Sequence, residues 1–287
     1  MASLRSMIAG DRVILCSVVF NPLMGILAEK AGFEALYLGG NTLGLAKGAL
    51  EATLTQTEMV QAAIDIRAVT SAPLILDAAA GWGDPMHMHR TIAQAEAAGF
   101  QAIEIEDQIL PKRVHHHIGI EHMVPQELME AKIREAAAAR RGKELLVIGR
   151  TNAIRNTGMD DALRRAEAYR KAGADLLMLF PRNAEEVRYV HERLGGPFYY
   201  NVPHGGLSRF GLSIAEMGQC GCRILTDSVM PLLAAYKAWR DCYRATAGTL
   251  IYPDMPPEEA DKLEDELFKI VGIEKLLEVE RRTVEKP

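Results

Sequence analysis

The sequence predicts one α/β domain of the (β/α)8, or TIM-barrel, class, followed by a C-terminal helical extension. The first indication is that apolar runs alternate with stretches of helical spacing eight times in ~250 residues, which is the count of a barrel. The second is that no glycine-rich phosphate-binding loop follows the first run, as it usually does in a doubly wound sheet. The third is that polar residues recur where the runs end, as at the catalytic face of a barrel.

The apolar runs predict the strands, because parallel strands that are buried on both faces are apolar throughout. They cover 13–19, 35–38, 74–77, 102–107, 145–151, 176–180, 198–202 and 223–227. The stretches of helical spacing predict a lead-in helix at 1–10 and then helices at 23–33, 57–69, 86–98, 126–141, 160–172, 184–194, from Ile214, and at 230–247. Gly10 and Gly32 mark the ends of the first two helices.

No linker or low-complexity stretch divides this pattern, so we expect a single catalytic barrel domain, 1–250, and a helical extension, 251–287. The extension begins with the proline-rich segment P-D-M-P-P-E-E. Its apolar residues then recur at helical spacing: Leu263, Leu267, Ile270, Val271, Ile273, Leu276, Leu277 and Val279. An apolar stripe beyond a complete barrel needs a surface that buries it, on its own barrel or on a neighbouring subunit.

Composition indicates an ordinary globular chain of 287 residues with a net charge of −5, so no basic excess favours nucleic-acid binding. The four cysteines lack paired metal-ligand spacing, which favours reduced thiols in the cytoplasm. The N-terminus lacks a signal-peptide pattern, and no segment has the ~20 apolar residues of a membrane span. We therefore expect a cytoplasmic protein that is neither exported nor membrane-bound.

The most informative stretch is Ile103–His117, I-E-I-E-D-Q-I-L-P-K-R-V-H-H-H. Its apolar run should deliver Glu106 and Asp107 to the end of a buried strand. Pro111 then breaks strand pairing, and the next residues bring two positive charges and three histidines close to the acids. A titratable loop beside carboxylates is a plausible catalytic lid.

Asp77 and Glu106 end neighbouring strands, so their carboxylates should converge at the catalytic face. Such a pair favours a hard cation of the magnesium kind, which keeps water ligands and leaves positions for an oxyacid. Arg150 should face them, and its planar fork suits a carboxylate or a phosphonate. The other polar residues expected at strand ends are Ser17, Gly39, Gly40, Asn41, Thr151, Asn152, Arg182, Asn201, His204, Asp227 and Ser228.

Five segments give the chain a resemblance to the isocitrate lyase/phosphoenolpyruvate mutase superfamily, in its branch of 2-methylisocitrate lyases and oxaloacetate decarboxylases. They are A-E-K-A-G-F-E-A-L-Y-L-G-G (28–40), L-D-A-A-A-G-W-G (76–83), I-E-D-Q-I-L-P-K-R (105–113), G-R-T-N-A (149–153) and N-V-P-H-G-G (201–206). The resemblance implies a barrel that forms a homotetramer, with helices near the C-terminus exchanged between subunits. It also implies a Mg²⁺ or Mn²⁺ site and a reaction through an enolpyruvate-like oxyanion.

By this resemblance, Asp77 is a direct metal ligand and Glu106 reaches the metal through water. Glu51 stands where the family usually has an outer-shell Asp. The acid pair D-A-D of the family is here Asp77-Ala78-Ala79, so one carboxylate of the metal shell is missing and the affinity for metal should be lower. Asp84 could replace it, but Asp before Pro at a helix start is ordinarily an N-cap.

The resemblance also assigns catalytic residues. Arg150 matches the arginine that clamps the substrate, and Lys112 matches the lysine of the gating loop. The catalytic Cys of K-R-C-G-H is replaced by Val114. A histidine, His115 or His116, would then serve as acid/base, or the reaction needs none; the alternative is that the histidines belong to a solvated loop.

Substrate binding falls, by the resemblance, to the backbone amides of Gly39 and Gly40 and to Asn201, and we include the adjacent Asn41. Two residues depart from the family pattern and should make the pocket more cationic: His204 and Arg182 stand where glutamates are common. The alternative for Arg182 is an ion pair with one of the glutamates that follow it.

These observations predict a Mg²⁺- or Mn²⁺-dependent carbon–carbon lyase that acts on a small 2-oxo or 2-hydroxy di- or tricarboxylate through a stabilised enolate. The missing Cys slightly favours decarboxylation of an oxaloacetate-like acid over cleavage of a methylisocitrate-like or dimethylmalate-like acid. One alternative is a phosphonopyruvate hydrolase or phosphonomutase. Another is a barrel that has lost catalysis and keeps a binding role.

Overall fold

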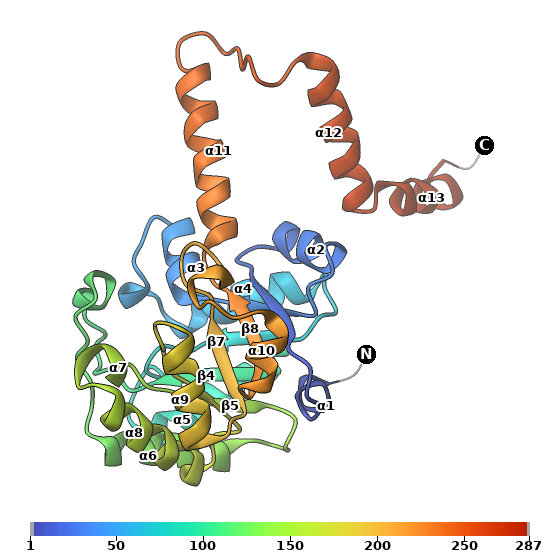
Figure 1. Cartoon of the computed structure of the whole chain (residues 1–287). Coiled ribbons are helices and arrows are strands. Elements are labelled where there is room, and N and C mark those ends of the chain that lie inside the picture. Colours follow the sequence, from blue (N-terminus) through green and yellow to red (C-terminus); the bar gives the residue numbers. More distant parts are fainter. Residues whose placement is uncertain (1–2, 286–287) are drawn as a thin grey trace. The chain divides into compact units, whose positions relative to one another are not determined.

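The computed structural model describes residues 3–285 and contains a closed barrel of eight parallel strands in sequence order (Figure 1). The strands are β1 Ile14–Val18, β2 Ala35–Leu38, β3 Leu74–Asp77, β4 Ala102–Glu106, β5 Leu146–Arg150, β6 Leu176–Met178, β7 Phe198–Asn201 and β8 Cys222–Asp227. β8 pairs with β1 and closes the barrel. The predicted (β/α)8 class is confirmed.

The helices follow the strands as predicted. They are α1 Leu4–Ile8, α2 Pro22–Lys30, α3 Gly40–Ala46, α4 Gln56–Arg67, α5 Met88–Ala97, α6 Gln126–Ala139, α7 Ala153–Asn156, α8 Met159–Ala172, α9 Ala184–Leu194, α10 Ile214–Gln219, α11 Met230–Thr246, α12 Pro257–Ile270 and α13 Ile273–Thr283. Short 3-10 turns lie at η1 Glu51–Thr53, η2 Pro85–His87, η3 Val114–Ile118 and η4 Leu207–Arg209. None of the described helices is both long enough and apolar enough to cross a membrane.

Helix α3 was not predicted, because its glycines made the segment look like a loop. Tertiary packing explains the glycines. A Cβ on Gly40 would lie 2.6 Å from Cγ of Glu51, and one on Gly44 would lie 2.9 Å from the Glu51 amide nitrogen. The close approach of η1 to α3 therefore requires glycine and outweighs its low helix propensity.

One hydrophobic cluster fills the barrel interior, and it includes Ala102 of β4. Because side chains alternate along a strand, Glu104 and Glu106 point to the same side as Ala102, toward the interior. Ile103 and Ile105 point outward and are fully buried. Strand β4 thus carries two charged groups to the catalytic end of the barrel.

The chain divides into two compact units, Met1–Met230 and Pro231–Pro287. The division falls at the start of α11, a helix that the sequence analysis counted with the barrel. The second unit holds most of α11 together with α12 and α13, and many of its large apolar side chains are exposed: Leu233, Tyr236, Trp239, Tyr243, Leu263, Leu267, Phe268, Val271, Leu276 and Leu277.

Candidate active site

Lys112 lies in the loop between β4 and α6, which we predicted to be a lid, and its side chain is buried beside two acids. The Nζ atom of Lys112 is 2.5 Å from Oε1 of Glu51 and 2.6 Å from Oε1 of Glu106. All three side chains are at most 5% exposed. Burial alone would lower the pKa of Lys112, but the charges of Glu106 and Glu51 outweigh it and raise this pKa. The lysine is therefore a firmly protonated cation between two acids.

Arg150 faces the acids, as predicted. Its register partner across the β4–β5 pair is Glu106, and its Nη2 atom is 3.1 Å from Oε2 of that residue. Its Nη1 atom donates to Oε1 of Glu104 over 2.6 Å. Asn152 donates its Nδ2 to Oε2 of Glu106 over 2.9 Å. Burial would raise the pKa of Glu106, but Arg150 and Lys112 outweigh it and hold this pKa well below its usual range.

Glu104 was missed from the sequence, although its spacing of two residues from Glu106 on one strand was a usable signal. It is 1% exposed and accepts hydrogen bonds from Arg150 and from the Tyr37 hydroxyl, the latter over 3.2 Å. Burial, opposed in part by Arg150 and reinforced by the charge of Asp77, raises the pKa of Glu104 to about 8. We call Glu51, Asp77, Glu104 and Glu106 the acid cluster.

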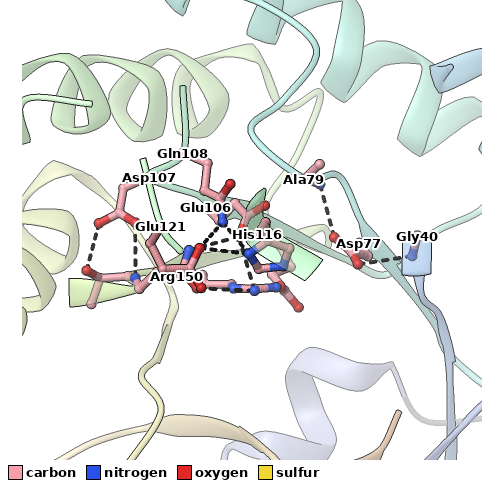
Figure 2. A network of polar contacts seen from close by, with 12 residues as sticks. Gly40, Asp77, Ala79, Glu106, Asp107, Gln108, His116, Glu121 and Arg150 are labelled. Carbon is pink, nitrogen blue, oxygen red and sulfur yellow. Dashed lines mark hydrogen bonds and ion pairs between the residues drawn. The ribbon is translucent and has the colours of Figure 1, made fainter. Parts of the chain in front are cut away.

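Asp77 has its own contacts, which Figure 2 shows apart from the network around Glu106. One carboxylate oxygen accepts from the Gly40 amide and the other from the Ala79 amide, both over 3.0 Å. Ala79 has a left-handed φ of 46°, which is uncommon for a residue other than glycine. The Gly40 amide, predicted to bind substrate, is therefore engaged by Asp77 in this structure, while Gly39 caps α3 and Asn41 lies in its first turn.

The acid cluster fits a divalent cation by charge and by donor chemistry. Four carboxylates lie near two cations, Lys112 and Arg150, so acids outnumber cations, although Glu104, with its pKa raised to about 8, adds no charge at neutral pH. Burial and the charge of Asp77 raise the pKa of Glu51, as expected where negative charge is uncompensated. Carboxylate oxygens are the ligands that Mg²⁺ and Mn²⁺ prefer. Within the described residues, no three acids, histidines or cysteines already converge on one point, because Lys112 lies between two of the acids.

The lid forms a second buried network around His116, as Figure 2 shows. The Nδ1 atom of His116 is 2.6 Å from Nε2 of Gln108 and 2.7 Å from Oε2 of Glu121, and Gln108 also donates to Glu121. The Glu121 side chain is fully buried. His115 instead stacks on His122 at the exposed surface of the lid. Of the two predicted acid/base candidates, only His116 is tied to a buried acid.

Asp107 does not join the acid cluster. Its carboxylate accepts from the Thr151 hydroxyl over 2.7 Å and from the Tyr169 hydroxyl over 2.9 Å, and Arg165 lies 3.5 Å away. Asp107 does lie with Glu106 at the end of β4, as predicted, but its side chain points away from the acid cluster because consecutive strand residues point to opposite sides. Asp107 ties β4 to β5 and α8.

The predicted substrate residues Asn201, His204 and Arg182 line one cavity of about 430 Å³ at the ends of β6, β7 and β8. Arg155 and Arg209, which the sequence analysis did not single out, line it as well. Arg182 also pairs with Glu186, since its Nε donates over 2.8 Å. The alternative interpretation of Arg182, an ion pair with a glutamate that follows it, is therefore confirmed.

Asp84 occupies the N-cap position of η2, just before Pro85. Its amide donates to Nδ1 of His87 over 3.0 Å. The N-cap interpretation of Asp84 is confirmed, and nothing ties this residue to the acid cluster.

Fold and site together define a class: a TIM-barrel enzyme whose acidic centre lies at the carboxyl ends of the strands. Residues 4–247 match the family model described as phosphoenolpyruvate phosphomutase. The chain belongs to the phosphoenolpyruvate mutase/isocitrate lyase superfamily, as its motifs suggested.

Relatives in this superfamily are lyases and decarboxylases. The chain is 30% identical to 2,3-dimethylmalate lyase of Eubacterium barkeri, over 97% of this chain and 96% of that one. It is 33% identical to 2-methylisocitrate lyase of Aeropyrum pernix, over 82% and 76% of the two chains. It is 32% identical to oxaloacetate decarboxylase of Pseudomonas putida, over 85% and 83%. The prediction of an enzyme of the carbon–carbon lyase kind is confirmed at the level of the family.

A solved structure of phosphonopyruvate hydrolase, in complex with oxalate and Mg²⁺, superimposes with a TM-score of 0.83 at 26% identity, over 98% of both chains. The barrel is therefore shared with an enzyme of the phosphonate branch as well as with the lyases.

Proposed function

We propose that the chain is a Mg²⁺- or Mn²⁺-dependent enzyme that cleaves a C–C bond of a small 2-oxo or 2-hydroxy di- or tricarboxylate. The observation that carries this proposal is the acid cluster facing Arg150 at the ends of β3, β4 and β5. An excess of carboxylate oxygens beside a buried guanidinium suits a metal ion and an oxyacid side by side.

Asp77, Glu106 and Glu51 are the residues that would hold the ion. When bound, the ion would polarise the substrate oxygen and balance the charge of an enolate. Arg150 binds the carboxylate next to that oxygen. Two of its nitrogens are engaged by Glu104 and Glu106, and its Nε is buried without a partner among the described residues.

Gly39, Gly40 and Asn41 form the side of the site next to Asp77. Their backbone amides would bind a substrate oxyanion once a metal ion takes Asp77 away from the Gly40 amide. At the ends of β6 and β7, Asn201 and His204 line the cavity together with Arg182. Substrate thus lies between the start of α3 and this cavity.

Proton transfer falls to His116, because Val114 leaves no thiol in the lid. Nδ1 of His116 contacts both the Glu121 carboxylate and the Gln108 amide, so the other ring nitrogen, Nε2, is the atom we assign to proton transfer. In this structure Lys112 lies between Glu51 and Glu106 and balances part of their negative charge. His115, exposed on the lid, has no such orienting acid.

A second candidate function is phosphonopyruvate hydrolysis or phosphonate mutation. It is favoured by the likeness to the phosphonopyruvate hydrolase structure and by the absence of a thiol at Val114. Arg150 and the acid cluster would serve a phosphonate as they serve a carboxylate.

The test is ¹H and ³¹P NMR on metal-replete enzyme given oxaloacetate, 2-methylisocitrate, 2,3-dimethylmalate and phosphonopyruvate, with Asp77→Ala as the control. We expect one carboxylate substrate to disappear only with the intact enzyme. A change confined to the ³¹P signal would overturn the proposal in favour of the phosphonate reaction. No change, together with no Mg²⁺ binding by calorimetry, would favour a barrel with a binding role.

We also propose that the chain acts as a homotetramer with exchanged C-terminal helices. The support is the row of exposed apolar side chains on the second unit, which includes Trp239, Leu267 and Leu276. Light scattering during size exclusion should give about four times the 31.6 kDa chain mass. A mass of one chain would contradict the assembly.

A further inference from the structure

The turn that follows β3 begins at Asp77 and has a strained backbone. Ala79, Gly81 and Trp82 all have a left-handed φ, of 46°, 85° and 55°. Two of these residues carry side chains for which this conformation is costly, so the turn persists only because its surroundings hold it. The groups that hold the turn therefore decide where the Asp77 carboxylate lies.

The carbonyls of residues 78–81, which form this turn, each accept a hydrogen bond. Two of the donors are backbone amides, one in the turn itself and one in β4, over 2.8 and 2.9 Å. The third donor is the hydroxyl of Thr91 in α5, over 3.0 Å. The fourth is the Nζ atom of Lys132 in α6, which donates to the Ala80 carbonyl over 3.0 Å. Two neighbouring helices thus fix the turn, and one of them does so with a cation.

Lys132 is an uncommon choice for this contact. The residue is 1% exposed and forms no ion pair among residues 3–285. Burial lowers the pKa of Lys132, and the charge of Asp84 opposes this effect. Burying an ammonium group beside one carbonyl costs free energy, but a charge-assisted bond is roughly twice as strong as a neutral one. The contact from Lys132 is therefore a stronger restraint on the turn than the contact from Thr91.

The restraint at Ala80 acts on Asp77 through the residue between them in the turn. The Ala79 amide donates to Oδ1 of Asp77 over 3.0 Å, and the Gly40 amide donates to Oδ2 over 3.0 Å, as Figure 2 shows. A turn that is released at Ala80 can relax from its left-handed conformation, and the Ala79 amide moves with it. The carboxylate of Asp77 then loses one of the two amides that orient it.

Building on the proposed function, in which Asp77 is a ligand of the metal ion, we propose that Lys132 is a positioning residue that holds the Asp77 carboxylate ready for the ion through the Ala80 carbonyl. Lys132 acts from outside the acid cluster, since its Nζ atom contacts a backbone carbonyl. A ligand that is oriented in advance needs no further ordering when an ion binds, which raises the affinity for the ion. Lys132 thus supports metal binding without touching metal or substrate.

The experiment uses the full-length chain and three variants. Lys132→Met removes the donor at similar side-chain length, and Lys132→Arg restores a cation. Arg140→Met is the matched control, because Arg140 caps the C-terminal end of α6 and also donates to a backbone carbonyl over 3.0 Å. That carbonyl belongs to Leu145, just before β5, at the end of the barrel opposite the acid cluster.

Two quantities are measured for each protein. Hydrogen–deuterium exchange of segment 77–83, followed by mass spectrometry in metal-free buffer, reports how firmly the turn is held. Calorimetry gives the Kd for Mg²⁺. We expect Lys132→Met to speed exchange of this segment and to raise the Kd for Mg²⁺ about 10- to 100-fold, with recovery in Lys132→Arg. Arg140→Met should lower the urea midpoint of unfolding but leave both quantities unchanged.

Unchanged exchange of segment 77–83 in Lys132→Met would overturn the positioning role. So would an equal rise of the Kd in Arg140→Met, because the effect would then be general destabilisation. Faster exchange with an unchanged Kd would overturn the link to the ion and leave the proposed function in place. If the wild type binds neither Mg²⁺ nor Mn²⁺, the proposed function fails, and faster exchange in Lys132→Met still supports the hold of Lys132 on the turn.

Lys132→Gln is the second variant if Lys132→Met does not fold. It keeps an amide donor and removes the charge, so we expect its exchange rate and its Kd for Mg²⁺ to rise less than those of Lys132→Met. Values equal to those of the wild type would show that the cation is not needed and would overturn the proposal.

Discussion

The ends of β3, β4 and β5 and the ends of β6, β7 and β8 differ in how their charges are balanced. On the first side, acids outnumber cations, and both Lys112 and Arg150 contact two carboxylates each. On the second side, arginines line a cavity that contains no acid. One side of the barrel mouth is built to take up a cation, and the other is built to take up an anion.

The two sides differ in exposure as well as in charge. The acid cluster is buried, and Lys112 and Arg150 hold three of its four carboxylates. The cationic side is more exposed: the Arg155 side chain is 44% exposed and that of Arg182 is 72% exposed. Removal of a cation should therefore cost more stability on the first side than on the second.

The largest expected effect follows from Asp77→Asn, which removes one charge but preserves side-chain size. Loss of a ligand on the acidic side should lower kcat/KM about 1000-fold and weaken Mg²⁺ binding, since charge aimed at the reacting oxygen contributes several kcal/mol. Steady-state kinetics and metal calorimetry provide the measurement. Asp84→Asn, an acid at the N-cap of η2, is the matched control and should stay within about threefold of wild type. Equal losses in both variants would contradict the assignment.

The comparison predicts unequal effects on stability when one cation is removed from each side. Lys112→Met leaves two buried carboxylates without their shared cation and should lower the free energy of unfolding by about 3 kcal/mol in metal-free buffer. Arg155→Met should lower it by less than about 1 kcal/mol, because its ion pair is long and partly exposed. Urea unfolding measures both. Added Mg²⁺ should restore part of the free energy of unfolding that Lys112→Met loses. Similar losses of this free energy in the two variants would contradict the difference between the two sides.

Glu121 links the two sides, because it holds His116 of the lid and lies near Arg155. Glu121→Gln keeps the hydrogen-bonding shape but removes the charge that would stabilise a protonated His116. We expect kcat to fall about 10- to 100-fold, the usual contribution of a positioned acid or base, with little change in KM. Steady-state kinetics separate these two parameters. A rise in KM with kcat unchanged would instead assign Glu121 to substrate binding.

The smallest expected effect concerns an ion pair outside both sides, Asp161 with Arg165 of α8. Burial raises the pKa of Asp161, but hydrogen bonds from Thr157 and Arg165 outweigh burial and lower this pKa below its ordinary value of 3.8. A lowered folded-state pKa means that the carboxylate stabilises the fold above that pH, and that this stability is lost as the pH falls through the folded-state value. Asp161→Asn should reduce the acid-induced decrease of Tm, by an amount worth less than about 1 kcal/mol because solvent screens the pair.

Thermal melts between about pH 2 and pH 7 measure this effect. The neighbouring Asp160→Asn is the control, since it removes the same charge from the first turn of α8. A Tm profile of Asp161→Asn that is as steep in acid as that of the wild type would show that the pair contributes nothing.

The sequence alone was enough to predict the barrel, because strands buried on both faces read as apolar runs and helices that cover them read as amphipathic stretches. It also indicated which strands end in Asp77, Glu106 and Arg150. The alternation of side chains along β4 would also have predicted that Glu104 points inward and Asp107 points outward.

Only the tertiary structure decided how these groups are paired. Lys112 and Glu51 are separated by 61 positions in the chain, and no local pattern could indicate that the lid lysine reaches that acid. Strand register set Arg150 opposite Glu106, and the ring of Phe180 brought Arg155 near Arg150. The sequence determined which residues lie at the strand ends, because that follows from local periodicity. Which charges meet there depends on barrel closure and loop path, because these alone bring distant segments within bonding distance.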